Sequence, residues 1–193
     1  MHWRDDRHAE YNINRPTHPT LSSREPVQRN REETWSLALE NTWHAGESVD
    51  FVAGASYDRN EIRQAQDYNA NLGLFDYPTG GSDAWNGQVA THWQLAPGSR
   101  VGASLSSRTR FPTTFERFST RFGTAIPNPD LASERGTSLE LSWNLAFSED
   151  AQLDMAAFYS DVSDMIQTVI VAAGPPQLTQ TRNVGDGRFY GIE

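Results

Sequence analysis

The side chains that most often perform catalysis or bind metals occur in this chain without the spacing that such sites require. Three of the five histidines, at positions 2, 8 and 18, form no His-x-x-x-His pair with a third ligand. The other two are single residues in polar runs, and there is no Gly-x-Ser-x-Gly nucleophile motif. The carboxylates between residues 58 and 76 do not have the spacing of a calcium loop. We therefore expect no enzyme active site, no metal site and no cofactor.

Two polar segments carry aromatic and cationic side chains that suit contact with a bulky ligand. Segment 60–83 mixes aromatics with Asn, Asp and Gly, which combines stacking with polar positioning. Segment 111–135 contains arginines that can pair with an anionic chelate. The candidate ligand-contact residues are Tyr68, Phe75, Tyr77, Arg117 and Arg121. The alternative is that the aromatics pack among themselves and that the arginines pair with Glu116 and Glu134.

The composition suggests that apolar side chains are confined to one face of each element. Only 37% of the residues are hydrophobic, yet there are six tryptophans, six tyrosines and nine phenylalanines, whereas disordered chains are poor in aromatics. The net charge of −9 argues against a nucleic-acid partner, which requires a basic surface. Cysteine is absent, so no disulfide framework is expected. No apolar run reaches the length of about 18 residues that a transmembrane helix needs.

Apolar and polar residues alternate with period two, which predicts antiparallel β-strands. In segment 34–43, for example, Trp35, Leu37, Leu39 and Trp43 alternate with small or polar residues. The same pattern is found in segments 49–58, 85–95, 101–106, 138–147 and 153–159. Residues 2–12 and 179–193 are predicted as two more strands with a weaker pattern. The chain is therefore predicted to be all-β, with about eight strands.

The predicted connections alternate between tight turns and long polar loops. The tight turns are expected at 45–47, 96–98 and 148–151. The long loops are expected near 13–29, 60–83 and 111–135, with a shorter one at 172–177. In an up-and-down antiparallel sheet, this order places all tight turns at one end of the sheet and all long loops at the other.

Two environments fit a sheet with one apolar and one polar face: a soluble β-sandwich and an outer-membrane barrel. Tryptophans near both ends of two strands, at 35 and 43 and at 85 and 93, are typical of the aromatic girdles of a barrel. Strands of about ten residues, small polar side chains on the other face and the alternation of turns and loops also favour the barrel. A soluble β-sandwich that binds carbohydrate is the alternative, and a self-contained small barrel is a third.

Three motifs resemble those of TonB-dependent outer-membrane receptors. Segment 108–143, RTRFPTTFERFSTRFGTAIPNPDLASERGTSLELSW, resembles the passage from an R-x-P strand end through an NPDL-x-x-E loop into a new strand. The next strand and the last one, which ends RNVGDGRFYGIE, resemble the family as well. The matching residues include Arg110, Pro112, Glu116, Asn128, Pro129, Leu131, Glu134, Glu140, Phe158, Asp161, Asn183, Gly185, Gly191 and Glu193.

The resemblance implies a large barrel of the twenty-two-stranded type, in which a plug domain fills the lumen. It also implies the outer membrane of a Gram-negative bacterium, outer loops that capture a scarce ligand such as an iron-siderophore or cobalamin, and a TonB energy-transducing complex that acts through the plug. Glu140 and Glu193 would face the lumen or the plug. Since neither a plug nor a TonB box is recognisable, we expect an internal segment of about eight strands from the C-terminal half of such a barrel.

Overall fold

The computed structural model describes residues 2–8, 11–12, 23–24, 26–69, 71–120, 123–148 and 151–193. Within these residues there are thirteen strands and one short helix. Their bounds are β1 (His2–His8), β2 (Tyr11–Asn12), β3 (Ser23–Arg24), β4 (Gln28–Ala45), β5 (Val49–Asn69), β6 (Gly73–Asp76), β7 (Gly80–Ala96), β8 (Ser99–Arg110), α1 (Thr114–Phe118), β9 (Glu134–Ser148), β10 (Ala151–Ser163), β11 (Ile166–Ala172), β12 (Leu178–Asn183) and β13 (Gly187–Ile192).

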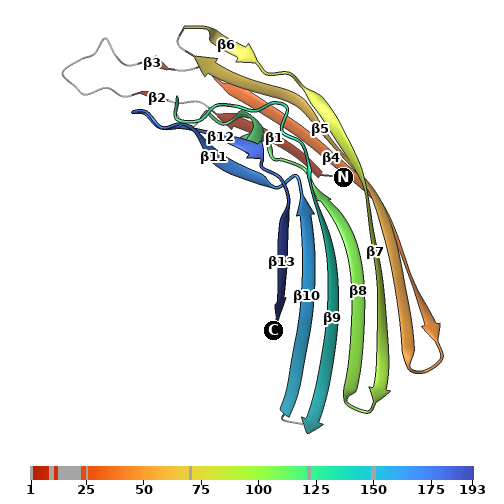
Figure 1. Ribbon diagram of the computed structural model, residues 1–193. Coiled ribbons are helices and arrows are strands. Elements are labelled where there is room, and N and C mark those ends of the chain that lie inside the picture. The colour runs from red at the N-terminus through yellow and green to blue at the C-terminus, as the bar shows by residue number, and fades with distance from the viewer. Residues whose placement is uncertain are drawn as a thin grey trace.

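One antiparallel sheet forms a curved wall (Figure 1). Eight strands follow one another in the order β1-β4-β5-β7-β8-β9-β10-β13, and β6 pairs with β5 beside this path. Neighbouring strands along the path are antiparallel, which confirms the predicted up-and-down sheet of about eight strands. Since β1 and β13 stand at opposite ends of the path, the described strands form an open sheet and not the self-contained small barrel.

The tight turns and the long connections lie at opposite ends of the wall, as predicted (Figure 1). Strands β4 and β5 are joined across 46–48, and β7 and β8 across 97–98. Gly98 has a φ of 77° in its turn, a conformation that glycine adopts without steric cost. At the other end lie α1 and the small hairpins β2–β3 and β11–β12.

The prediction of a loop over 60–83 is wrong for much of its length. Strand β5 continues to Asn69, β6 follows, and β7 already begins at Gly80. The apolar alternation ends near residue 58, but the backbone still pairs with β4 and with β7 or β6. The loop near 111–135 contains α1, and the predicted last strand is divided into β12 and β13. Most of the predicted loop near 13–29 lies outside the described residues.

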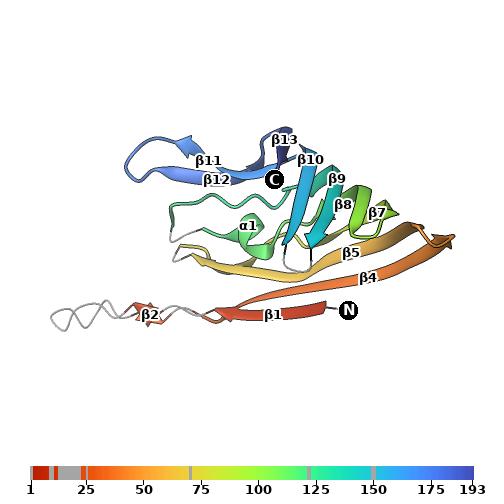
Figure 2. The ribbon, with the colours of Figure 1, turned by 90° about the horizontal axis from the view of Figure 1, so that it is seen from below.

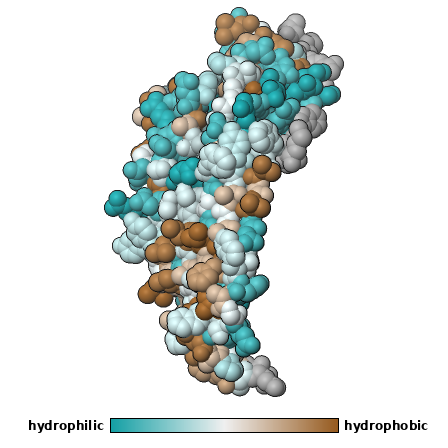
Figure 3. Space-filling model, turned by 90° about the vertical axis from the view of Figure 1, so that its right-hand side faces the viewer, coloured by the Kyte–Doolittle hydropathy of each residue, from teal (hydrophilic) through white to brown (hydrophobic). Residues whose placement is uncertain are grey.

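The large apolar side chains of the wall are exposed on its outward face. Leu37 and Leu39 are 72% and 78% exposed, and Trp85 is 67% exposed. Figure 3 shows hydrophobic side chains gathered over the middle and lower part of this surface, beneath a mainly hydrophilic upper part. The buried apolar side chains of the described chain are Ile62, Ala65, Ala84, Pro112, Phe118 and Leu131.

The soluble β-sandwich alternative is therefore wrong. A sandwich buries its apolar face under a second sheet, but the additional sheets among the described residues have two strands each and lie at the loop end. The only described helix, α1, has five residues, and none in the described chain is long and apolar enough to cross a membrane.

Two rows of aromatic side chains border the exposed apolar band. The upper row crosses three strands: the ring centroid of Tyr57 lies 5.4 Å from that of Trp35 and 5.1 Å from that of Trp85. The lower row, near the tight turns, contains Trp43, Trp93 and Trp143, each 40% to 53% exposed. In the strand register Trp43 lies opposite Phe51, and Trp93 and Trp143 both lie opposite Val101. Two such rows are typical of the two interfaces of a membrane.

The register of the wall is interrupted only near its two ends. Among the described pairs of the main sheet, shifts occur at Arg31/Glu32, above the upper row, and at Gln94/Ala96 and Ala151/Gln152, below the lower row. Between the aromatic rows the ladders are continuous. In this stretch the alternation of outward and inward side chains is therefore uninterrupted along each described strand.

Candidate functional site

Helix α1 and the hairpin β11–β12 fold over the concave side of the wall at its loop end. Seen from below, α1 lies between β5 and the hairpin (Figure 2). Beneath α1 is the small core of Ile62, Ala65 and Phe118, with Tyr77 packed against it. Because the outward face of the sheet has no cover, this is where side chains of the described chain are buried from solvent.

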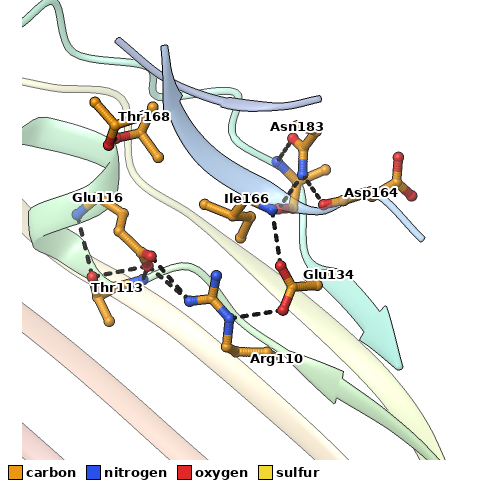
Figure 4. Close-up of polar contacts among 10 residues, drawn as sticks. Arg110, Thr113, Glu116, Glu134, Asp164, Ile166, Thr168 and Asn183 are labelled. Carbon is orange, nitrogen blue, oxygen red and sulfur yellow. Dashed lines mark hydrogen bonds and ion pairs between the residues drawn. The ribbon is translucent and has the colours of Figure 1, made fainter. Parts of the chain in front are cut away.

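Arg110 connects the end of strand β8 to two carboxylates (Figure 4). Its Nη1 donates to both carboxylate oxygens of Glu116, at 3.0 and 3.1 Å, and its Nε donates to Glu134 Oε1 at 3.2 Å. Glu116 belongs to α1 and Glu134 begins β9. The guanidinium therefore ties the strand, the helix and the next strand together through charge-assisted hydrogen bonds.

The start of α1 is a capping box. Thr113 Oγ1 accepts from the backbone N–H of Glu116 at 3.2 Å, and the Thr113 backbone N–H donates to Glu116 Oε2 at 2.8 Å. The two residues thereby satisfy backbone donors that the first turn leaves free. Pro112, just before the cap, is fully buried. Pro112 and Glu116 of the sequence motif thus fix where the helix begins.

Glu134 and Asn183 hold the hairpin against the loop that follows α1. Glu134 Oε2 accepts from the backbone N–H of Ile166 at 2.8 Å. Asn183 Nδ2 donates to the carbonyls of Ala132 and Asp164, at 3.1 and 2.8 Å, and its Oδ1 accepts from the Ala132 N–H at 2.9 Å. The chain bends before the hairpin, between β10 and β11, at Asp164, which has a φ of 54°. These bonds fix the hairpin in its bent position.

The NPDL segment also takes part in this contact region. We call the region, made of α1, the NPDL segment, the β11–β12 hairpin and the strand ends that they contact, the joint. Asn128 Nδ2 donates to the carbonyl of Thr181 in β12 at 2.9 Å, and its backbone N–H donates to the Arg117 carbonyl at 2.7 Å. Pro129 follows, and its carbonyl faces Arg117 Nη1 at 3.4 Å. Leu131 is only 1% exposed. The motif therefore combines a turn, a bridge to the hairpin and a buried apolar side chain.

Both carboxylates of this joint are held in their charged form, above the upper aromatic row. Burial alone would raise the pKa of Glu116, but the Thr113 N–H and the Arg110 guanidinium outweigh it and lower the pKa. Burial also acts to raise the pKa of Glu134, and again Arg110, together with the Ile166 N–H, lowers it. Hydrogen bonds to the ionised form cause both shifts.

The concave face below the joint is polar and hollowed. A hollow of about 460 Å³ lies over β4, β5, β7 and β8. Within it Gln88 Nε2 donates to Glu40 Oε2 at 2.5 Å, and Arg108 Nη2 donates to Gln88 Oε1 at 2.6 Å. Gln88 and Glu40 lie on strands that β5 separates, and β5 has Gly54 between them. Since glycine has no side chain, the two long side chains meet above it.

Comparison with known proteins identifies this architecture. The family described as TonB dependent receptor-like, beta-barrel matches residues 1–193. The chain belongs to this family of TonB-dependent receptors. The resemblance read from segment 108–143 and the later strands is thereby confirmed. A search of curated proteins finds no match.

Solved receptors and transporters share the fold at low sequence identity. The hemophore receptor HasR of Serratia marcescens, solved with its hemophore and heme, is 14% identical with a TM-score of 0.71, over 98% of this chain and 37% of that one. The copper transporter OprC is 20% identical with a TM-score of 0.74, over 95% and 29%. The ferric yersiniabactin receptor FyuA of Yersinia pestis is 19% identical with a TM-score of 0.61, over 90% and 25%. The chain spans about a quarter to two fifths of their length.

In this receptor chain, two predicted ligand-contact aromatics pack against each other. Tyr77 stacks on Phe118, with centroids 4.9 Å apart, and meets Phe75 edge-on at 5.2 Å. The Tyr77 hydroxyl donates to Asp67 at 3.0 Å, and burial, reinforced by this bond, raises the pKa of Tyr77. Tyr68 is half-buried on β5. Phe75 and Tyr77 therefore pack against each other, as the alternative for these aromatics expected. Their contact with a ligand stays a prediction.

Arg117 is the predicted contact cation that the structure places in the joint. Burial lowers the pKa of its half-buried guanidinium, while Glu32 and Asp130 act in the opposite direction. Its Nη1 bond to the Pro129 carbonyl is long, at 3.4 Å, and its Nε is buried with no hydrogen-bond partner in the described chain. Arg121 lies outside the described residues.

Glu140, Gly191 and Glu193 of the motifs lie on the concave face near the end of the path. Glu140 is opposite Ser104 and Phe158 in the register. Gly191 is opposite Phe158, and a Cβ at Gly191 would lie 2.9 Å from that ring. The glycine therefore leaves room for the Phe158 ring. Glu193, just after β13, exchanges backbone hydrogen bonds with Ala156.

One further contact joins α1 to the wall and has no local signal in the sequence. Glu32 Oε2 accepts from the Thr114 hydroxyl at 3.0 Å, and its Oε1 accepts from Asn60 Nδ2 at 2.6 Å. Both Thr114 and Asn60 are buried. Thr114 is 82 residues from Glu32, so no local pattern could have paired them. The described residues contain no group of three or more His, Asp or Glu side chains suited to a metal ion.

Proposed function

We propose that this chain forms part of the wall and outer gate of an outer-membrane receptor that takes up a scarce ligand, such as an iron-siderophore, by an energised process. The observation that carries the proposal is a single sheet whose two faces suit different solvents. Its outward face has an uncovered apolar band between two aromatic rows, and its concave face is polar and hollow. Such a wall separates lipid from an aqueous lumen.

The class of ligand is inferred from the neighbours and from the joint. Solved neighbours include receptors for heme carried by a hemophore, for ferric yersiniabactin and for ferric catecholates, and a copper transporter. Arg117, half-buried and with an unsatisfied Nε, is suited to an anionic metal chelate. Tyr68 adds a half-buried aromatic on the same end of the wall. Coupling to TonB would act through a plug domain in the lumen.

Uptake by cells that produce the full-length receptor tests this function. The cells are given radiolabelled ferric catecholate, ferric hydroxamate or heme, with and without a protonophore. We expect accumulation of one of these compounds, abolished by the protonophore. Accumulation of none, or accumulation that the protonophore leaves intact, would contradict the proposal.

A pair of variants assigns the ligand contact. Arg117→Gln should weaken binding of the accumulated compound about tenfold, since one hydrogen bond to a charged group is worth about 1.5 kcal/mol. The control is Arg100→Gln. Arg100 is exposed and lies beside the tight turn at the other end of the wall, so this variant should bind as the unaltered receptor does. Equal binding by both variants would remove Arg117 from the ligand site.

A further inference from the structure

Charged side chains appear on the outward face as soon as the upper aromatic row is passed. Between Trp85 and Trp93 the outward positions of β7 are Gly87, Val89 and Thr91, and none is charged. Just above the row, the outward face carries charged side chains on several strands. Arg59 and Asp83 lie two residues beyond Tyr57 and Trp85, and Arg135, Asp161 and Arg188 lie near the loop-end termini of β9, β10 and β13. This boundary is where the headgroups of a lipid layer would meet the wall.

Arg135 differs from the other arginines of this boundary in its partners. Its Nη1 donates to Ser107 Oγ at 3.0 Å and its Nη2 to the Trp85 carbonyl at 3.0 Å. Both acceptors are uncharged, and no salt bridge joins Arg135 to a carboxylate of the described chain. Arg59, by contrast, pairs with Glu61, and Arg188 lies 3.5 Å from Asp161. Of the five N–H donors of a guanidinium, these two bonds leave most unused.

The position of Arg135 suits an anionic headgroup whose acyl chains lie on the band below. It precedes Leu139 and Leu141 on the outward face of β9, and these leucines are 44% and 53% exposed. Its guanidinium extends across β8 to the level of Trp85 in the upper aromatic row, where lipid headgroups would meet the wall. Its planar fork matches the geometry of a phosphate.

We propose that Arg135, assisted by Arg188, binds the phosphate of an anionic lipid in the outer leaflet. The net charge of −9 repels anionic lipids overall, so attraction has to come from a local cation without a carboxylate partner. Arg188 lies on β13 opposite Asp161 of β10, which is opposite Thr137, two residues along β9 from Arg135. The Arg188 side chain is 70% exposed, and its ion pair with Asp161 is loose, at 3.5 Å. The inference rests on the lipid-facing assignment in the proposed function, but it requires no transported ligand.

The full-length receptor in nonionic detergent is titrated with phosphatidic acid, and bound lipid is counted by native mass spectrometry. Arg135→Gln should raise the dissociation constant about fivefold, and adding Arg188→Gln should raise it about fivefold again, since each basic residue near an anionic surface contributes that much. Arg182→Gln is the matched control. Arg182 is an exposed arginine on the β11–β12 hairpin, and within the described chain it likewise bonds only an uncharged partner, Gln180. It should bind lipid as the unaltered receptor does.

Three further arms keep the test decisive. Diacylglycerol with the same acyl chains, which lacks the phosphate, should bind the unaltered receptor and Arg135→Gln equally, and Arg135→Lys should retain more affinity than Arg135→Gln. Inorganic phosphate in large excess should leave the lipid bound, and displacement would reassign the site to free phosphate. Unchanged affinity of Arg135→Gln for phosphatidic acid, or an equal loss for both lipids, would overturn the proposal. Uptake by the receptor would be unaffected by that failure, so the two proposals fail separately.

Discussion

Leucine is exposed in the wall between the aromatic rows and buried in the joint above it. Leu39, in the middle of the wall, is 78% exposed, whereas Leu131, in the joint, is 1% exposed. The wall is held by continuous backbone ladders. The joint is held by side chains, through the bonds of Arg110, Glu134 and Asn183.

The difference follows from the solvent that each region meets. In lipid, an exposed leucine costs nothing, but every backbone polar group has to be paired within the protein. In water, apolar side chains gain free energy by burial, and loops need specific polar contacts to be ordered. The same chain therefore needs a regular sheet in one region and a set of particular side chains in the other.

The largest effect is expected from a cavity in the joint. Leu131→Ala should lower the free energy of opening segment 111–133 by about 2–5 kcal/mol, as for other buried leucines. Hydrogen exchange of the α1 amides in the full-length receptor measures this opening. Leu39→Ala, on the lipid face, is the control and should leave exchange in the joint unchanged. Comparable exchange in both variants would show that Leu131 does not support the joint.

A charge placed on either face of one strand tests the two solvents of the wall. Leu39→Arg should destabilise the folded receptor by about 2–4 kcal/mol, because position 39 lies midway between Trp35 and Trp43 and would put a charge in the lipid core. Ala38→Arg places the same charge on the concave face and should cost less than about 1 kcal/mol. Urea unfolding in lipid vesicles gives both values. Equal costs would mean that the outward face does not meet lipid.

The bond between Glu134 and the hairpin should depend on pH. Because the folded-state pKa of Glu134 is lowered from 4.5, its stabilisation is full above that value and is lost as the pH falls through the lower, folded pKa. Glu134→Gln should remove about 1.5 kcal/mol, the lower end for hydrogen bonds to charged groups, and with it most of the pH dependence.

Spin labels can report whether the β11–β12 hairpin separates from the loop that follows α1. Ile126 and Ile170 are exposed, and each neighbours Thr179, Ile126 through a backbone bond and Ile170 in the β11–β12 ladder. Labels on Ile126→Cys and Ile170→Cys should therefore broaden each other's spectra in the closed joint. Broadening should fall with acid in the otherwise unaltered receptor and respond less to pH in Glu134→Gln, in which Glu116 remains as a carboxylate of the joint with a lowered pKa. An equal pH response in both would assign the titration to another group.

The smallest effect is expected at the helix cap. Thr113→Ala removes the side-chain half of the capping box and should cost about 1 kcal/mol. Thr113→Ser keeps the hydroxyl and should be close to neutral. The same exchange measurement on α1 distinguishes them, and equal exchange in both variants would show that the hydroxyl does not order the helix.

The wall could be predicted from the sequence because the alternation of apolar and polar residues reflects the different environments of its two faces. Trp35, Leu37, Leu39 and Trp43 stand on one face in the structure as in the pattern. The tight turns between β4 and β5 and between β7 and β8 fall where expected, and the centre of the turn predicted at 148–151 lies outside the described residues. The upper half of β5 was missed because no apolar alternation marks it. There the strand is stabilised by ladder bonds and cross-strand pairs such as Arg63 with Glu33.

The joint was only partly predictable. The motif identified Arg110 and Glu134, but their pairing joins residues 24 apart, and the contact of Asn183 with Ala132 spans 51. Helix α1 is too short for a periodic pattern. Its capping box, Thr113-x-x-Glu116, was the one local signal that could have located it. The bend at Asp164 depends on backbone conformation that side-chain patterns do not encode.

The confinement of register shifts to the ends of the strands has a consequence for how such a chain can change in length. One residue inserted between Trp35 and Trp43 would exchange the lipid and lumen faces for the rest of the strand, so every leucine beyond it would enter the water-filled side. Opposite Arg31 and Glu32, an extra residue of β5, Arg63, is already accommodated. Insertions and deletions are therefore expected to survive in the segments beyond the aromatic rows, while the stretch between them changes by substitution alone.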